Sequence, residues 1–261
     1  IVQLEGSMSY DRFMRRHGGV ITAPTDAVLP EFDSKIHVGD FAFRPDLPVH
    51  MAIDPGHFVY AVVFIQVVDG TVRIIDEIYA NKWSHEEIIN ESRMRPLWAN
   101  VGRGKHVMDI AGSQHHDGDP PTAKRWLDDT DIRFNMKKRR VEDVVERLRS
   151  FLTISPITGR PRLQVARHCV GTIAEMGRGK SPIDGVRIWK MKNGKPEAAN
   201  NHACSAFGYW GLFYYGTSRP EAEDYEELED EWGTSSVSNY LGGGWDDGLR
   251  DDPFEALMLR Q

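Results

Sequence analysis

Apolar residues in the middle of the chain follow strand-like and helix-like periods in turn. Runs of β-branched and aromatic residues predict strands over 49–54, 60–68, 71–79, 105–110, 163–167 and 186–191. Asp69-Gly70, between the second and third runs, is typical of a two-residue hairpin turn. Helical periodicity predicts helices over 84–98, 122–128, 141–152 and 196–215, the first opening with a Ser84–Glu87 capping box. This order of elements predicts an α/β fold with a mixed central sheet flanked by helices.

The chain divides into three parts of different composition. Residues 1–48 are rich in Gly and Pro and predict an irregular approach segment, whereas residues 49–216 carry the regular pattern. Residues 217–261 are acidic with few apolar side chains, which is typical of a flexible tail. No membrane span and no signal peptide is predicted. Because the sequence begins with Ile1 rather than Met, we interpret it as a piece of a longer chain.

The formal net charge of −7 is unevenly distributed along the 261 residues. Residues 217–261 hold 13 of the 39 acidic residues and three of the 32 basic ones, so the tail carries −10 and the remainder +3. The overall charge therefore does not exclude nucleic acid as a partner of the body. Cys169 and Cys204 are too few for a disulfide framework or a cysteine zinc site, which favours a reducing compartment.

Two aspartates stand at the ends of predicted strands. Asp54 precedes Pro55-Gly56, and Asp109 precedes Ile110-Ala-Gly112. Carboxylates at adjacent strand ends converge in the crevice where open α/β sheets bind ligands, and their mutual repulsion favours a cation between them. Mg²⁺ and Mn²⁺ prefer such oxygen ligands, and two such ions can catalyse phosphodiester displacement. The alternative is that each aspartate only caps the turn after its strand.

These motifs carry a family resemblance. Met51-Ala-Ile-Asp-Pro-Gly56, a hairpin ending Ile75-Asp-Glu-Ile-Tyr79, and Val107-Met-Asp-Ile-Ala-Gly112 occur in that order. The sequence resembles the nuclease domain of tailed-phage large terminase subunits, which is ribonuclease H-like. Residues 12–19 and 29–33 resemble the stretch that joins the ATPase motor of those proteins to the nuclease.

The resemblance implies a metal-dependent endonuclease that cuts concatemeric double-stranded viral DNA during packaging by a two-metal mechanism using Mg²⁺ or Mn²⁺. It also implies an ATPase motor in the same full-length chain, portal and small-subunit partners, and the host cell cytoplasm as the location. Residues 1–48 would then be the linker from the motor, 49–216 the nuclease domain and 217–261 the tail.

The third acidic position of the family differs in this chain. Asn201 and His202 fall on the usual acidic pair, and Ser205 falls on the later aspartate. We therefore expect Asp54, Asp109, His202 and Asn201 as metal ligands, with His202 also a candidate general base and the second metal weakly held. Glu77 and Ser205 are expected beside these ligands. The alternative for His202 is an ordinary helix histidine.

A basic run precedes the helix at 141–152. Lys137, Lys138, Arg139 and Arg140 are adjacent, and we expect them to contact DNA phosphates together with Arg178 and Lys180. The alternative is a solvated helix start, which is usual for charge runs.

Two further motifs are set aside, and two other functions stay open. The P-loop-like run over 174–181 reads as helical where a strand is required, and His115-His116 lies in a polar loop. A resolvase or transposase would share the ribonuclease H-like site, and a catalytically weak DNA-binding module would share the basic surface.

Overall fold

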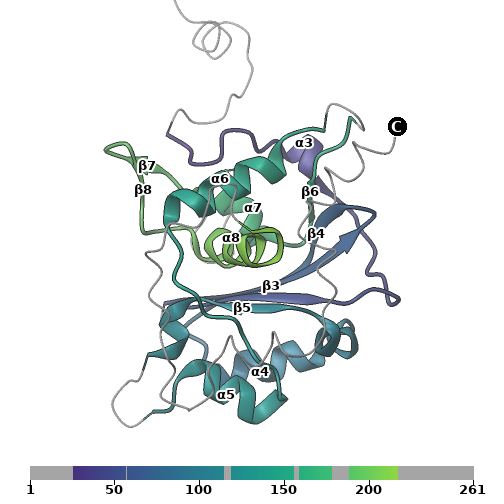
Figure 1. Cartoon of the computed structure of the whole chain (residues 1–261), viewed down its shortest axis with the longest axis vertical. Coiled ribbons are helices and arrows are strands. Elements are labelled where there is room, and N and C mark those ends of the chain that lie inside the picture. Colours follow the sequence, from purple (N-terminus) through teal and green to yellow (C-terminus); the bar gives the residue numbers. More distant parts are fainter. Residues whose placement is uncertain (1–25, 57, 115–118, 156–158, 178–187, 217–261) are drawn as a thin grey trace, which may run out of the picture.

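The computed structural model describes residues 26–56, 58–114, 119–155, 159–177 and 188–216. Figure 1 shows three layers, in which α6, α7 and α8 cover one face of a central sheet and α4 and α5 cover the other. This arrangement confirms the predicted α/β fold with a mixed sheet flanked by helices. Within the described residues, no helix is both long and apolar enough to cross a membrane.

The elements follow the predicted pattern closely. The strands are β1 (Val38–Gly39), β2 (His50–Pro55), β3 (Val59–Val68), β4 (Thr71–Asn81), β5 (His106–Met108), β6 (Leu163–Ala166), β7 (Met191–Lys192) and β8 (Lys195–Pro196). The α-helices are α3 (Ser34–His37), α4 (His85–Met94), α5 (Thr122–Thr130), α6 (Val141–Leu152), α7 (Val170–Met176) and α8 (His202–Tyr215). Two 3₁₀ turns, η1 (Trp98–Arg103) and η2 (Ile110–Ser113), flank β5.

The sheet has the strand order β1-β6-β4-β3-β2-β5. The meander β2-β3-β4 is antiparallel, whereas β5 joins β2 in parallel and β6 joins β4 in parallel. The parallel pairing sets Ile53 opposite Met108, so the C-terminal ends of β2 and β5 lie side by side. Asp54 and Asp109 are the next residues of the two strands, as the sequence predicted from strand ends.

Side-chain alternation divides the core into two clusters, one on each face of the sheet. Ala52, Ala61 and Val107 pack in the cluster that includes α6 and α8. Met51, Ile53 and Met108 pack in the opposite cluster with α4 and α5. Asp54 is two residues beyond Ala52 and Asp109 two beyond Val107, so both carboxylates project toward α8.

A β-bulge changes the direction of the side chains along β4. The register shifts between Phe64 and Ile65, so that Phe64 lies opposite Asp76 but Ile65 lies opposite Ile74. The extra residue reverses the alternation for the remainder of the strand. Glu77 and Tyr79 consequently point to the same face as α7 and α8.

Three predicted boundaries differ from the structure, each for a local reason. Helix α8 begins at His202 rather than at 196, because Pro196 ends β8 and Asn200 adopts a positive φ of 56°. Helix α4 ends at Met94 before Pro96, so Trp98 belongs to η1. The strand expected over 186–191 is reduced, in the described part, to a bridge at Lys190 and the start of β7.

The described part of the approach segment packs on the domain. Val28, Leu29 and Phe32 are buried in the same cluster as α6 and α8. The described part of the approach segment therefore contributes side chains to this core cluster. Val28 also donates its backbone N–H to the carbonyl of Trp189, whose own N–H bonds to the carbonyl of Glu175.

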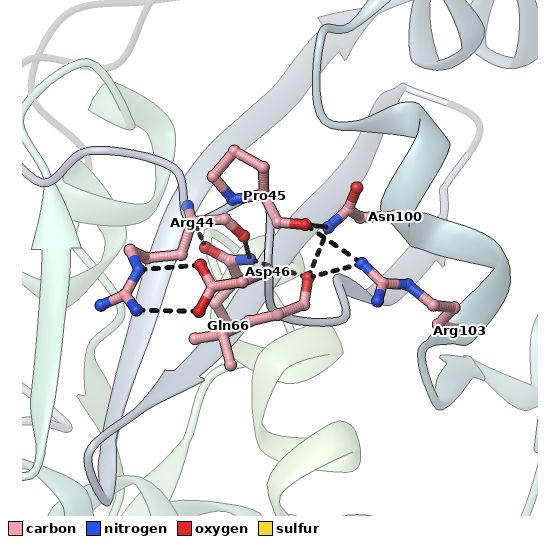
Figure 2. Close-up of polar contacts among 7 residues, drawn as sticks. Arg44, Pro45, Asp46, Gln66, Asn100 and Arg103 are labelled. Atoms are coloured by element: carbon pink, nitrogen blue, oxygen red, sulfur yellow. Dashed lines mark hydrogen bonds and ion pairs between the residues drawn. The ribbon is translucent and has the colours of Figure 1, made fainter.

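The backbone of residues 44–47 is hydrogen-bonded by two side-chain amides, Gln66 on β3 and Asn100 on η1 (Figure 2). The buried Gln66 accepts from the backbone N–H of Arg44 and donates to its carbonyl. Asn100 donates to the carbonyls of Pro45 and Leu47, at 2.7 and 2.6 Å. These contacts satisfy the backbone of a segment that has no strand partner of its own among the described residues.

Two buried histidines join β2 to β5 near their starts. His50 Nδ1 accepts from the backbone N–H of Lys105 at 2.8 Å, and His106 Nδ1 accepts from that of Met51 at 3.1 Å. An accepting Nδ1 requires the neutral imidazole. Burial, helped by the charges of His106 and Lys105, lowers the pKa of His50 to about 3, and burial lowers that of His106 to about 4.

We expect these histidines to make the fold acid-sensitive. Their pKa values are lower in the folded state than the ordinary 6.5, so their stabilising contribution is complete above pH 6.5 and is lost as the pH falls toward 4 and 3. At pH 5 the loss reaches about 2 kcal/mol per histidine. Urea unfolding at pH 7.5 and pH 5 should show it. In the double variant H50N/H106N, whose Oδ1 atoms can accept the same bonds, the drop should be smaller; an equal drop would contradict this account.

Candidate functional site

The site forms where the ends of β2 and β5 meet the first half of α8. His202 is the first residue of α8, and its Nδ1 lies 3.0 Å from Oδ2 of Asp54. The side chains of His202 and Asp54 are 27% and 17% exposed, so the pair is open to a ligand. Two residues that the sequence analysis nominated separately are thus in direct contact.

Asp109 lies at the start of η2 and near Tyr209 of α8. Its carboxylate accepts from the backbone N–H of Ala111 at 2.8 Å and caps η2. The hydroxyl of Tyr209 on α8 lies near enough to the Asp109 carboxylate to be affected by its charge. Burial raises the pKa of Tyr209, and the neighbouring Asp109 charge raises it further, so the phenol stays protonated as a donor. Sequence analysis missed Tyr209, although its spacing of seven residues from His202 could have indicated it.

His202 and Tyr209 lie on the same face of α8. His202, Ser205 and Tyr209 are spaced by three and four residues, which places them on one helical face. Ser205, the middle residue of the three, is buried. Residue 56 must be glycine here, because a Cβ atom would overlap the carbonyl oxygen of Val59 and would also contact the ring of His202.

The charges of the site are coupled. Burial raises the pKa of Asp54; the contact with His202 opposes this shift, and the charge of Asp109 adds to it. Burial lowers the pKa of His202, but the hydrogen bond and charge of Asp54, assisted by Glu175, outweigh it and the net shift is upward. Asp109 thus adds a like charge near Asp54, which favours a cation beside the two carboxylates.

Glu175 lies behind His202 and was not nominated from the sequence. It belongs to α7 and is 1% exposed, yet it carries a carboxyl group. Oε1 accepts from the hydroxyl of Tyr79 at 2.7 Å, and Oε2 accepts from the backbone N–H of Cys204 at 2.9 Å. Burial raises the pKa of Glu175 to about 7, and the two hydrogen bonds oppose the rise.

The remaining predicted residues lie in different surroundings. Glu77 accepts from the N–H groups of Gly171 and Thr172 and from the hydroxyl of Thr172, so its carboxylate caps α7 instead of facing the crevice. Asn201 precedes α8, and its side chain does not cap the helix. Arg178, Lys180 and the polar loop with His115-His116 lie outside the described residues.

The basic run follows a short bridge to β5. Asn135 extends the sheet edge by a parallel bridge to Val107, accepting from the N–H of Met108 and donating to the carbonyl of His106. Because the bridge is parallel, the following residues run toward the same end as Asp109. Lys137, Lys138, Arg139 and Arg140 follow at once and lead into α6. Lys138 and Arg140 are exposed.

The donor set fits one oxygen-preferring cation better than two. Asp54 and Asp109 provide hard carboxylate oxygens on neighbouring strands. Among the described residues, however, no three or more His, Cys, Asp or Glu side chains gather as a metal-binding group. His202 Nδ1 is already engaged by Asp54.

Comparison with solved structures identifies the fold. The large terminase of a thermophilic bacteriophage, in complex with ATP-γ-S, matches with a TM-score of 0.55 at 14% identity, covering 79% of this chain and 53% of that one. The P22 large terminase nuclease domain matches with a TM-score of 0.53 at 14% identity, covering 74% of this chain and 94% of that domain. The chain has the fold of a large terminase nuclease domain. This likeness confirms the ribonuclease H-like fold expected from the sequence.

The two matched structures differ in how much of their own length this chain covers. The chain spans about half the length of the thermophilic phage's large terminase, but nearly all of the P22 nuclease domain is covered. No protein-family model matches the sequence, and a search of curated proteins found no match. The fold is therefore identified through structure rather than through sequence similarity.

The contact between His202 and Asp54 can be measured in the metal-free protein. In D54N the charge that holds the pKa of His202 up is removed while burial persists, so we expect this pKa to fall. Nuclear magnetic resonance titration of the histidine rings measures it. His106, which accepts from the N–H of Met51 at the start of β2, is the internal control, and its lowered pKa should be the same as in the wild type. An unchanged pKa of His202 would show that the pair does not form in solution.

Proposed function

We propose that this chain is a metal-dependent DNA endonuclease that acts as the nuclease part of a large terminase. The observation that supports it best is the convergence of Asp54 and Asp109 on the face covered by α8 of a terminase nuclease fold. A divalent ion bound there would activate water and stabilise charge on the phosphate. Mg²⁺ and Mn²⁺ suit the carboxylate donors. Full two-metal chemistry would require a further oxygen ligand, for which Asn201 is the candidate.

The chain's own residues supply the remaining functions. Asp54 and Asp109 would hold the cation, with the backbone N–H of Ala111 fixing the orientation of Asp109. Asp54 fixes Nδ1 of His202, which leaves Nε2 as the ring atom that can transfer a proton at the reacting phosphodiester. In the full-length protein we propose an ATPase motor on the same chain, with double-stranded DNA as substrate and portal and small terminase subunits as partners.

Plasmid cleavage tests the proposed activity directly. With Mn²⁺ or Mg²⁺ the wild-type chain should cut DNA, and D54A and D109N should each lower the rate by roughly 100-fold or more. D46N is the control, because Asp46 is exposed, pairs with Arg44 and lies near Gln66 at the other end of β3. Absence of cleavage with any divalent ion, together with retained DNA binding, would favour the non-cutting DNA-binding module.

The basic run should supply phosphate contacts. Its course past Asp109 supports the proposal that Lys138 and Arg140 bind the DNA backbone near the scissile bond. In K138A/R140A we expect weaker binding at low salt, and the slope of log K against log salt should fall by about two. The control K35A/R167A removes the same charge near β1 and β6, at the far sheet edge, and should leave the slope nearly unchanged. Equal slopes in the two variants would rule out this docking mode.

A further inference from the structure

The first turn of α8 has no cap of its own. Its N-cap residue, Asn201, makes no side-chain hydrogen bond to the turn, and the turn contains no acidic residue. The first N–H groups of a helix lack partners within the helix and carry its positive partial charge. Here they begin in the interior, because Ala203 and Cys204 are fully buried. An acceptor from another element is therefore required.

Glu175 is that acceptor. Its Oε2 bonds to the N–H of Cys204, the third helical residue, which an N-cap side chain would normally satisfy. A buried carboxyl group is costly unless it is hydrogen-bonded, so its presence in α7 calls for a specific partner. The start of α8 provides one.

The second carboxylate oxygen of Glu175 bonds to Tyr79, which lies in register with Asp54 across the sheet. Tyr79, which donates to Oε1, lies opposite Ala61, and Ala61 lies opposite Asp54. Three neighbouring strands thus place Asp54 and Tyr79 in one transverse row. Asp54 and Tyr79 are thus linked in two ways. One is the sheet itself. The other is a chain of hydrogen bonds from Tyr79 to Glu175, from Glu175 to the first turn of α8, and from His202 in that turn to Asp54.

We propose that Glu175 is a positioning residue of the nuclease site, holding the first turn of α8 so that His202 meets Asp54. This inference rests on the proposed nuclease function for its catalytic consequence, but not for its geometry. His202 and Cys204 belong to the same turn, so a shift of about 1 Å at Cys204 would lengthen the 3.0 Å contact beyond hydrogen-bonding distance. Glu175 therefore acts through His202 and does not need to touch the DNA.

Three substitutions at Glu175 separate its contacts from its charge. E175Q retains a carbonyl oxygen for the N–H of Cys204 and an amide for the hydroxyl of Tyr79. E175L retains volume but offers no acceptor. E175D keeps the carboxylate but is one methylene shorter, so it reaches Cys204 only if the turn moves. I89A is the control, because Ile89 is buried on α4, on the opposite face of the sheet.

The first measurement is the ¹⁵N spectrum of the His202 ring at pH 8 in metal-free protein, with D54N as the reference for a broken contact. We expect the E175Q ring signals to match the wild type, and the E175L and E175D signals to shift toward those of D54N. If E175L does not fold, E175D decides the result alone. Wild-type signals in E175D, or the same displacement in I89A, would overturn the proposal.

The second measurement is DNA cleavage by the same variants. E175Q should remain within about threefold of the wild type, while E175D and E175L should lose about tenfold or more through misplacement of His202. I89A should cleave normally wherever it is folded; loss in I89A equal to that in E175D would assign the effect to stability. If the wild type itself does not cleave, the proposed function fails, whereas the ring spectra still decide whether Glu175 positions His202.

Discussion

The packing of α8 across the sheet is the contact on which the site depends. The helix is apolar on nearly all sides, and Ala206, Phe207 and Trp210 are fully buried. Residue 208 is glycine because a Cβ atom would overlap the side chain of Val144 on α6. With α6 on one side and the sheet on the other, α8 has little freedom to slide or rotate. His202, the first residue of α8, therefore meets Asp54 in a fixed arrangement, and Tyr209 is held on the side of Asp109.

The bulge in β4 extends the same constraint to the interior. A single extra residue reverses the side-chain alternation and turns Glu77 and Tyr79 toward the helices on the α8 side. Glu77 then caps α7, and Tyr79 binds Glu175 on that helix. The position of α7 is thus set by two strand side chains, and α7 in turn supports the start of α8. A register irregularity distant from the aspartates consequently affects the geometry around them.

Local sequence patterns predicted the parts of the molecule whose causes are local. The Asp69-Gly70 hairpin, the Ser84–Glu87 capping box and the apolar face of α6 each depend on neighbouring residues, and each is present. Asp54 and Asp109 could be nominated because strand ends are visible in sequence. The pairing of His202 with Asp54, the proximity of Tyr209 to Asp109 and the burial of Glu175 depend on the packing of distant segments. Periodicity cannot reveal these contacts.

The start of α8 shows how a local defect points to such a contact. Asn201 is of a residue type that often caps helices, but its side chain does not cap α8, and the first turn contains no acidic residue. A buried glutamate in the largely apolar helix α7 is likewise unfavourable unless its carboxyl group has a hydrogen-bond partner. Each departure is explained by the other, because the carboxylate of Glu175 satisfies the backbone that Asn201 leaves uncapped. Two local inconsistencies that resolve only through one tertiary contact are a signature of a site maintained for geometry rather than for stability alone.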